Sequence, residues 1–259
     1  MLPKGQPAAA RGPAPAQAAD AFALTVVLPI FAERDTVPEI VEGLCRLVPD
    51  VLHEVLLLVA GRAPEDTLRV VEETAARFPV CRVSMQKQNP GLGFGVRQGI
   101  DEATGTHILL MDSDGEMDVE TVPHMVAAVR ERKLDMVIGS RWAKGGGVEG
   151  YDQFKYYLNR GYQQLFGILY RTRVRDLTLG FKLARADVMK SMPWDSQFHD
   201  IGCETTMRVI RTGYAVGEVP TVWRKRKEGE SSNPFRRNFK YVWKALGILF
   251  KGSGASKIQ

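Results

Sequence analysis

The sequence has few cysteines and no long apolar run. Three cysteines are scattered through 259 residues without a CxxC pair, and this odd number argues against a disulfide framework and favours a reducing compartment. No stretch of 18 apolar residues occurs, so the sequence predicts no transmembrane segment. The four histidines lack metal-ligand spacing, so we expect them at surface or packing positions.

The first 21 residues lack the features of a targeting segment. They are rich in Ala, Pro and Gln and contain no continuous apolar segment, which predicts a disordered leader over 1–21 rather than a signal peptide. The rest of the chain is long enough for one large α/β domain. We predict this domain over 22–233, a basic amphipathic helix over 234–252 and a tail over 253–259.

Short apolar runs alternate with helical patterns through the first half of the chain. The runs are rich in β-branched residues and Leu and predict strands. They span 24–30, 54–60, 81–85, 107–112 and 135–139. Helical spacing lies between them at 36–48, 64–78, 93–103 and 119–132. This order predicts a mostly parallel sheet with helices on both faces, and such sheets bind ligands at the carboxyl ends of their strands.

Carboxylates follow the fourth predicted strand directly. The stretch "HILLMDSDGEMD" (107–118) places Asp112, Asp114 and Glu116 at the sheet edge where a ligand would bind. Carboxylates two residues apart on a turn can converge on one cation, and Mg²⁺ or Mn²⁺ prefers oxygen ligands while sharing its other positions with phosphate oxygens. The same residues also fit a polar turn followed by the N-cap of a helix near Val119. The motif alone leaves both interpretations open.

Five blocks of the sequence occur in the order and approximate spacing of family 2 glycosyltransferases. They are "TVVLPIFAERDTVPEIV" (25–41), "NPGLGFGVRQGIDEATGTHILLMDSDGEMD" (89–118), "VIGSRW" (137–142), "RDLTLGFKLARADVM" (175–189) and "GYAVGEVPTVWRKRKEGES" (213–231). The chain most resembles the branch that transfers mannose or glucose to polyprenyl phosphates such as dolichol phosphate. The resemblance implies a single Rossmann-like, GT-A type α/β domain, a nucleotide-diphosphate sugar donor and a divalent metal ion.

The resemblance also implies how the diphosphate is bound. Asp112, Asp114 and Glu116 match the family's Asp-x-Asp-x-Gln metal turn, with Glu in place of the usual Gln. Arg141 and Arg226 match two arginines that lie close to the substrate phosphates, where a planar guanidinium suits phosphate oxygens. Asp112 and Asp114 are therefore expected to act in catalysis through the metal.

The nucleotide pocket is expected at the end of the first strand. Pro29 and Glu33 match a Pro-x-Tyr-Asn-Glu segment of the family, in which this chain has Phe31 and Ala32. Phe31 can still stack on a base through its ring face. Gly91 opens a "GLGFG" stretch, for which we expect a tight approach to the donor site rather than a dinucleotide-binding loop.

The turn after the second strand departs from the family. The family usually has acidic residues here that read the base, whereas this chain has "AGRAPEDT" (60–67). Ala60 and Gly61 cannot accept a hydrogen bond through their side chains. Glu65 and Asp66 are expected to be displaced toward the next helix. We therefore expect weaker discrimination between nucleotide bases.

The acceptor site is implied at two further positions. The family's residues that bind the lipid phosphate fall near Tyr151 and Lys155, and Lys155 could bind phosphate. A phosphate acceptor is already ionised near neutral pH and needs no strong general base, whereas a hydroxyl acceptor would require one. Glu204 matches an acidic position near the acceptor and is the candidate base. Glu204 equally fits a helix N-terminal charge that complements the helix dipole.

The C-terminal helix carries an apolar stripe and a basic face. The stripe contains Phe239, Val242, Trp243, Leu246, Leu249 and Phe250, and the basic residues are Arg236, Arg237, Lys240, Lys244 and Lys251. Such a helix can lie in a bilayer interface or pack onto its own domain. A lipid-phosphate acceptor favours the membrane, so we expect a cytoplasmic protein that associates peripherally with the inner face of the membrane and binds no nucleic acid.

The sequence thus predicts an inverting, metal-dependent glycosyltransferase that uses Mg²⁺ or Mn²⁺ and transfers a sugar to a polyprenyl phosphate. Two alternatives stay open. A sugar-phosphate nucleotidyltransferase would share the sheet and the metal, but it would need a Gly-rich, basic loop after the first strand, where this chain has "PIFAERDT" (29–36). A non-catalytic relative that acts as a binding partner would account for the altered 60–67 turn.

Overall fold

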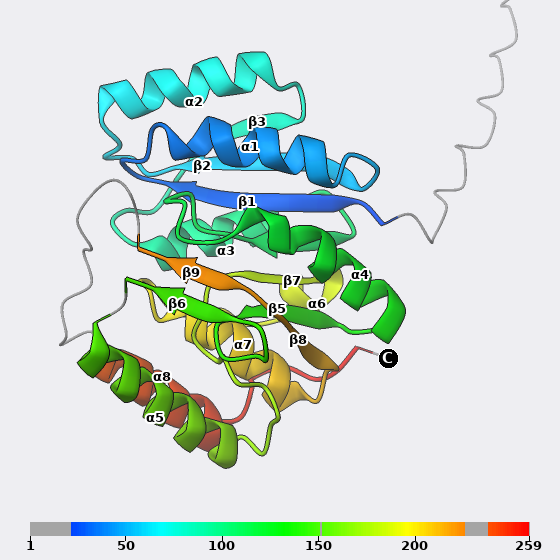
Figure 1. The fold of residues 1–259 in the computed structure, drawn as a ribbon, viewed down its shortest axis with the longest axis vertical. Helices are drawn as coiled ribbons and strands as arrows, with labels where there is room; N and C mark the ends of the chain where they lie inside the picture. Colours follow the sequence, from blue (N-terminus) through cyan, green and yellow to red (C-terminus); the bar gives the residue numbers. More distant parts are fainter. Residues whose placement is uncertain (1–21, 151, 226–237, 259) are drawn as a thin grey trace, which may run out of the picture.

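A computed structural model describes residues 22–150, 152–225 and 238–258, without the side chains of residues 155, 238 and 239 (Figure 1). Its centre is a seven-stranded sheet in the order β3-β2-β1-β4-β7-β5-β8. The strands are β1 (Leu24–Ile30), β2 (Leu52–Val59), β3 (Cys81–Met85), β4 (His107–Leu110), β5 (Met136–Ser140), β7 (Lys182–Arg185) and β8 (Val216–Pro220). Only β7 runs antiparallel to its neighbours β4 and β5 in this described sheet. The predicted mostly parallel α/β sheet is confirmed.

Helices cover both faces of the sheet. They are α1 (Thr36–Leu47), α2 (Glu65–Arg77), α3 (Leu92–Glu102), α4 (Val122–Arg132), α5 (Gln153–Leu169), α6 (Ala186–Lys190), α7 (Ile201–Thr212) and α8 (Asn238–Lys251), with a short 3₁₀ turn η1 (Val119–Thr121) before α4. Helices α1, α2 and α4 share one hydrophobic cluster with the sheet. Helices α3, α6 and α7 share the other, to which α5 and α8 add side chains from outside.

Strand β1 supplies both clusters because its side chains alternate between the two faces. Val26 and Leu28 lie in the cluster beneath α1 and α4, whereas Val27 lies in the cluster beneath α3. This is the two-residue period of a strand. Helix α3 approaches β1 closely at Gly99, where a Cβ atom would lie 2.3 Å from Val27 Cγ1. The continuous apolar run 24–30 is therefore explained by burial on both faces.

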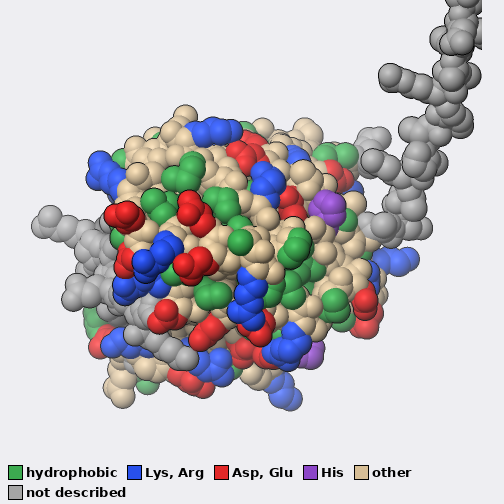
Figure 2. All heavy atoms as spheres, turned by 90° about the horizontal axis from the view of Figure 1, so that it is seen from above, with side chains coloured by type: hydrophobic (Ala, Val, Ile, Leu, Met, Phe, Trp, Pro, Cys, Tyr) green, Lys and Arg blue, Asp and Glu red, His purple; other side chains and the backbone are tan. Residues whose placement is uncertain are grey.

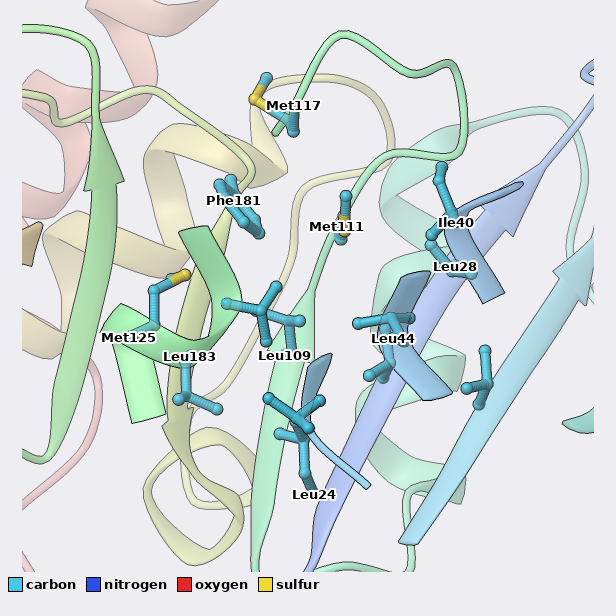
Figure 3. Packing of buried hydrophobic residues seen from close by; sticks show 14 of the residues in the cluster. Leu24, Leu28, Ile40, Leu44, Leu109, Met111, Met117, Met125, Phe181 and Leu183 are labelled. Atoms are coloured by element: carbon cyan, nitrogen blue, oxygen red, sulfur yellow. The ribbon is translucent and has the colours of Figure 1, made fainter. Parts of the chain in front are cut away.

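The acidic turn after β4 has a buried methionine at each end. Met111 and Met117 are buried, and their side chains point into the cluster that contains Leu28, Ile40 and Phe181 (Figure 3). The polar residues between the two methionines therefore remain at the carboxyl edge of the sheet. Asp118 then caps η1, since its Oδ1 accepts a hydrogen bond from the backbone N–H of Glu120 at 3.1 Å. The turn thus carries the predicted carboxylates at the edge of the sheet, and it also supplies the predicted N-cap through Asp118.

A two-stranded ribbon lies against this turn. Strand β6 (Gly147–Glu149) pairs in parallel with β9 (Val222–Arg224). On its other side β9 forms an antiparallel bridge between Trp223 and Met117. The sequence did not predict this ribbon, because three-residue strands carry no recognisable period.

Helix α8 confirms the predicted C-terminal helix between Asn238 and Lys251. Ala245 and Ile248 are buried, and Tyr241, Val242, Leu246 and Leu249 are partly buried against the second cluster. Three residues of the predicted apolar stripe, Val242, Leu246 and Leu249, therefore pack onto the domain, whereas Trp243 and Phe250 are exposed. No helix in the described part of the chain is both long and apolar enough to cross a membrane. The division into leader, domain, helix and tail stays a prediction.

Candidate active site

The ends of β1, β2, β4 and β5 gather the predicted site residues at one edge of the sheet. The pairing of Val27 with Leu110 places the segment after β1 beside the acidic turn after β4. Two hydrogen bonds join them: Ser113 Oγ donates to Pro29 O, and Thr36 Oγ1 donates to Ser113 O, both at 2.6 Å. The backbone of the turn is thereby fixed to β1 and to the start of α1.

The ribbon fixes the turn from the opposite side. Trp223 Nε1 donates to Glu116 Oε2 at 2.8 Å, and the backbone N–H of Arg224 donates to Glu116 O at 2.9 Å. The Arg224 guanidinium forms ion pairs with Asp118 at 3.2 Å and Glu149 at 3.1 Å. The pKa of Arg224 is accordingly raised, chiefly by its hydrogen bond to Asp118. The sequence alone did not indicate that Trp223 would form a hydrogen bond with Glu116.

Asp112 and Asp114 offer oxygen ligands suited to Mg²⁺ or Mn²⁺. Both side chains are half-buried, and Asp114 Oδ1 accepts a hydrogen bond from the Glu116 N–H at 3.0 Å, which orients that carboxylate. One oxygen of Glu116 is bonded to Trp223, and no group of three His, Cys, Asp or Glu side chains close enough to hold a metal occurs among the described residues. Metal binding by Asp112, Asp114 and Glu116 therefore stays a prediction, in which Glu116 has one carboxylate oxygen already bonded to Trp223.

Arg141 forms a buried ion pair at the end of β5, and its predicted closeness to the substrate phosphates stays a prediction. Its Nε and Nη2 donate to the two carboxylate oxygens of Asp176, both at 2.8 Å, and both side chains are buried. Nη2 also donates to Thr178 Oγ1 at 3.2 Å. A buried bidentate pair of this kind fixes both partners, because separating them would leave an uncompensated charge. Arg141 therefore joins the end of β5 to the segment before β7.

A buried lysine lies next to this pair. Lys182 Nζ donates to Gly202 O at 2.6 Å, Thr206 Oγ1 at 2.7 Å and Thr205 Oγ1 at 2.8 Å, which fixes β7 to the first turn of α7. Burial lowers the pKa of Lys182 to about 7, against the attraction of acidic neighbours that include Asp112. The sequence pattern did not indicate a buried role for Lys182, because a lysine in a strand pattern usually faces water.

Two residues predicted to bind the nucleotide, Phe31 and Glu33, differ in their contacts. Phe31 is exposed at the end of β1, and its ring remains available for stacking. Glu33 turns back on the same segment, where its Oε2 accepts from the N–H groups of Phe31 at 2.7 Å and Ala32 at 3.0 Å. In this arrangement Glu33 shapes the turn rather than presenting its carboxylate to a base.

The altered 60–67 turn is stabilised by residues that the sequence did not single out. Asn89 Oδ1 accepts from the Gly61 N–H at 3.1 Å, and a Cβ atom at Gly61 would lie 2.8 Å from Asn89 Nδ2. Asp66 is at the start of α2, as expected, and is paired with Arg34 at 2.7 Å. That hydrogen bond lowers the pKa of Asp66. No acidic side chain in this turn has been shown to replace the missing base readers, so weak base discrimination stays a prediction.

The glycine-rich loop before α3 packs against the segment before α7, whereas we expected it to approach the donor site. Gly91 has a φ of 142°, and a Cβ atom there would lie 2.2 Å from Gln197 O. Gly93 donates its N–H to the same carbonyl at 3.0 Å. The close approach is therefore to the segment before α7, and a contact of Gly91 with the donor stays a prediction.

Glu204 lies in a buried network at the start of α7. It is fully buried, and its Oε1 accepts from Arg208 Nε at 2.7 Å. Its Oε2 accepts from the Ser196 N–H at 2.9 Å. Glu204 thus connects α7 to the preceding loop, and its role as a general base stays a prediction. This outcome matches the alternative of a helix N-terminal charge.

Two predicted site residues cannot be placed in the same detail. Arg226 lies outside the described residues. Lys155 lies in the first turn of α5, but its side chain is outside the described part. Their contacts with phosphate stay predictions.

Glu204→Gln should lower the free energy of unfolding by about 3 kcal/mol, because it leaves the Arg208 guanidinium without its buried charge partner. Chemical denaturation measures this, with Glu131→Gln on the exposed face of α4 as the matched control. An unchanged unfolding free energy combined with loss of activity would instead assign Glu204 a catalytic role.

Comparisons with known proteins agree with this geometry. The sequence matches the family model of glycosyl transferase family 2 over residues 25–193. The dolichol-phosphate mannosyltransferase of Pyrococcus furiosus is 26% identical over 224 residues, covering 85% of this chain and 61% of that protein. The polyprenol monophosphomannose synthase of Mycolicibacterium smegmatis is 28% identical over 241 residues, covering 88% and 89%. The glucosyl-3-phosphoglycerate synthase from Mycobacterium tuberculosis, solved with Mn²⁺, UDP and phosphoglyceric acid, superposes with a TM-score of 0.66 at 17% identity, covering 91% of this chain and 80% of that chain.

These likenesses carry different weight. The structural one shows the fold alone and confirms the predicted GT-A type domain. The chain spans only 61% of the length of the Pyrococcus relative. The activity of that whole protein is therefore not assigned to this chain. The names of the relatives confirm the resemblance to the polyprenyl-phosphate branch. The family model covers residues 25–193, from β1 through the acidic turn to β7 and α6, and the chain therefore belongs to glycosyltransferase family 2.

Proposed function

We propose that this chain transfers a sugar, with inversion, from a nucleotide-diphosphate sugar to a polyprenyl phosphate and that it requires Mg²⁺ or Mn²⁺. The observation that carries the proposal is the pair Asp112 and Asp114 at the carboxyl edge of the sheet, on a turn fixed to β1 by Ser113 and to β9 by Trp223. A fixed turn holds its carboxylates in place before the ligand arrives, which is how a site avoids the cost of ordering them on binding.

The relatives support the substrates. Those at 26% and 28% identity are named for transfer of mannose to dolichol phosphate or for synthesis of polyprenol monophosphomannose. A third relative, from Micrococcus luteus, is named an undecaprenyl-phosphate mannosyltransferase and is 28% identical over 213 residues. A structural neighbour was solved with Mn²⁺ and UDP-glucose, which supports the use of a divalent ion.

The residues divide the work as follows. Asp112 and Asp114 would hold the metal ion, and Phe31 would stack on the base. A bound Mg²⁺ or Mn²⁺ ion would offset the negative charge that develops on the departing diphosphate. Arg141 would act indirectly, by fixing Asp176 and the end of β5 beside the site. Arg226 remains our candidate for direct contact with the diphosphate.

The burial of Glu204 favours a phosphate acceptor over a hydroxyl. A hydroxyl acceptor needs a carboxylate to take its proton, and the carboxylate proposed for that purpose is buried and paired with Arg208. A lipid phosphate is already anionic and can attack without such a base. Lys155, at the start of α5, is the proposed contact for that phosphate.

The two alternatives have less support. A nucleotidyltransferase needs a Gly-rich basic loop after the first strand, and the segment between β1 and α1 contains no glycine. A non-catalytic relative would explain Ala60 and Gly61, but it would not require the hydrogen bonds that fix the acidic turn. We further propose that the protein works at the inner face of the membrane, where a polyprenyl phosphate presents its head group, with α8 as a peripheral contact.

Asp114→Asn should abolish metal-dependent nucleotide binding without unfolding the protein, because the change is nearly isosteric and lies at the sheet edge. Calorimetric titration with nucleotide diphosphates and Mn²⁺ should show an affinity loss of more than about tenfold, the scale of one charged interaction. Glu120→Gln, an exposed carboxylate just beyond the turn, is the control. A large stability loss with unchanged Mn²⁺-dependent affinity would make Asp114 structural and remove the main support for the proposal.

Trp223→Phe should weaken Mn²⁺-dependent nucleotide binding by roughly threefold to tenfold, because Glu116 loses the donor that fixes the acidic turn. Glu116→Gln keeps an oxygen acceptor for the indole N–H and should bind nearly as the wild type does. Trp243→Phe, on the exposed face of α8, controls for loss of an indole elsewhere. Equal metal affinities in the Trp223→Phe variant and the wild type would show that the bond has no part in preparing the site.

A further inference from the structure

The loop after β3 is fixed against the end of β2. The backbone N–H of Gln86 donates to Val59 O at 2.8 Å, which continues the pairing of the two strands beyond β3. The buried Gln86 side chain then closes the loop, because its Nε2 donates to Gln88 O at 2.5 Å and to Gly91 O at 2.9 Å. These bonds determine where Asn89 lies.

Asn89 lies against the first residues of the 60–67 turn. Its Oδ1 accepts a hydrogen bond from the Gly61 N–H at 3.1 Å, and its Nδ2 donates to Gln86 O at 2.8 Å. A Cβ atom at Gly61 would lie 2.8 Å from Asn89 Nδ2. The amide of Asn89 therefore occupies the space that a side chain at position 61 would need.

The two hydrogen bonds fix the orientation of the Asn89 carboxamide. The backbone N–H of Gly61 can only donate and the carbonyl of Gln86 can only accept, so the oxygen and nitrogen of the side chain cannot exchange places without losing both bonds. Nδ2 has two N–H groups, and its bonds within the described part of the chain use one of them. Because Asn89 is exposed, the second N–H can donate to a ligand.

Phe31 lies at the end of the strand next to this turn. The backbone N–H of Ala60 donates to Ile30 O at 2.8 Å, which joins the end of β1 to the end of β2. Neighbouring strands are about 4.8 Å apart. A base that stacks on the exposed ring of Phe31, as we propose above, would therefore turn one edge toward the amide of Asn89.

The charges around this end of the sheet are balanced. Asp66 is paired with Arg34 at 2.7 Å, and Glu42 is paired with Arg77 at 3.1 Å. Figure 2 shows acidic and basic side chains intermingled over the face of the molecule that is seen from above, on the side of α2 in Figure 1. The common nucleobases are neutral near pH 7, so balanced charges do not distinguish them. Discrimination between bases therefore depends on hydrogen bonds.

We propose that Asn89 selects the nucleobase, by donating its second Nδ2 N–H to a carbonyl oxygen at the ring position where uracil has O4 and guanine and hypoxanthine have O6. Cytosine and adenine have an amino group at that position. Its N–H groups would face the N–H of Asn89 and leave both donors without an acceptor. The inference deepens the proposed function, on which it rests for the nucleotide-sugar.

Two matched pairs of nucleotides test the proposal on the full chain. Inosine diphosphate and ADP differ along this edge by a carbonyl in place of an amino group, and so do UDP and CDP. Calorimetric titration with Mn²⁺ should show that the wild type binds the carbonyl member of each pair about threefold to tenfold more tightly, the scale of one neutral hydrogen bond. Equal affinities within each pair would overturn the proposal.

Two substitutions of Asn89 should change the preference in different ways. Asn89→Ala removes the N–H and should abolish the preference, mainly through weaker binding of the carbonyl members. Asn89→Asp keeps an acceptor for Gly61 but replaces the N–H by a second acceptor, so it should reverse the preference toward ADP and CDP. Its added negative charge weakens all nucleotide diphosphates alike and cancels in the ratios. Gln88→Glu adds the same charge one residue earlier on the exposed loop and should keep the wild-type ratios.

The affinity ratios separate a role in specificity from a structural role. If Asn89 only holds the 60–67 turn, both Asn89 variants should weaken all nucleotides by one factor and leave the ratios unchanged, which would refute the proposal. Gly61→Ala should also reduce the ratios, because its Cβ atom displaces the amide without changing residue 89.

The same titrations distinguish failure of this inference from failure of the proposed function. If no nucleotide diphosphate binds with Mn²⁺, the proposed function fails and the role of Asn89 fails with it. If the nucleotides bind but the ratios do not depend on residue 89, only the role of Asn89 fails.

Discussion

The parallel pairing of β1 with β4 is the constraint on which the site depends. It places the end of β1, with Phe31, beside the acidic turn that follows β4. Met111 and Met117 bury the ends of that turn, so the polar residues between them have nowhere to lie except at the carboxyl edge. Hydrogen bonds from Ser113 and Trp223 then fix the turn on two sides. Core packing and the position of the carboxylates are therefore two results of the same arrangement.

Much of the fold could be predicted because its central strands are buried on both faces. Runs such as 24–30 and 107–112 are continuous and apolar for that reason, and their order fixes a parallel sheet. Strand β7 escaped prediction because Lys182 interrupts its apolar pattern while serving a buried network. The β6–β9 ribbon is too short for any period to appear.

The sequence predicted which residues belong to the candidate site better than it predicted what those residues contact. Asp112 and Asp114 follow a strand directly, so their location is a local property of the sequence. Arg141 depends on Asp176, 35 residues away, and nothing local indicates that this carboxylate occupies its guanidinium. Glu204 binds Arg208 one turn further along α7, a spacing visible in the sequence, but its complete burial is set by tertiary packing. A family match can name a residue without revealing which partner holds it.

We propose sugar transfer to a lipid phosphate at the Asp112–Asp114 turn. The most direct measurement is mass spectrometry of the lipid product after incubation with nucleotide-diphosphate sugars and a polyprenyl phosphate, with and without a metal chelator, followed by NMR of the anomeric centre. We expect a glycosyl polyprenyl phosphate with inverted configuration that forms only when Mg²⁺ or Mn²⁺ is present. Transfer that persists in the chelator, or a product with retained configuration, would contradict it.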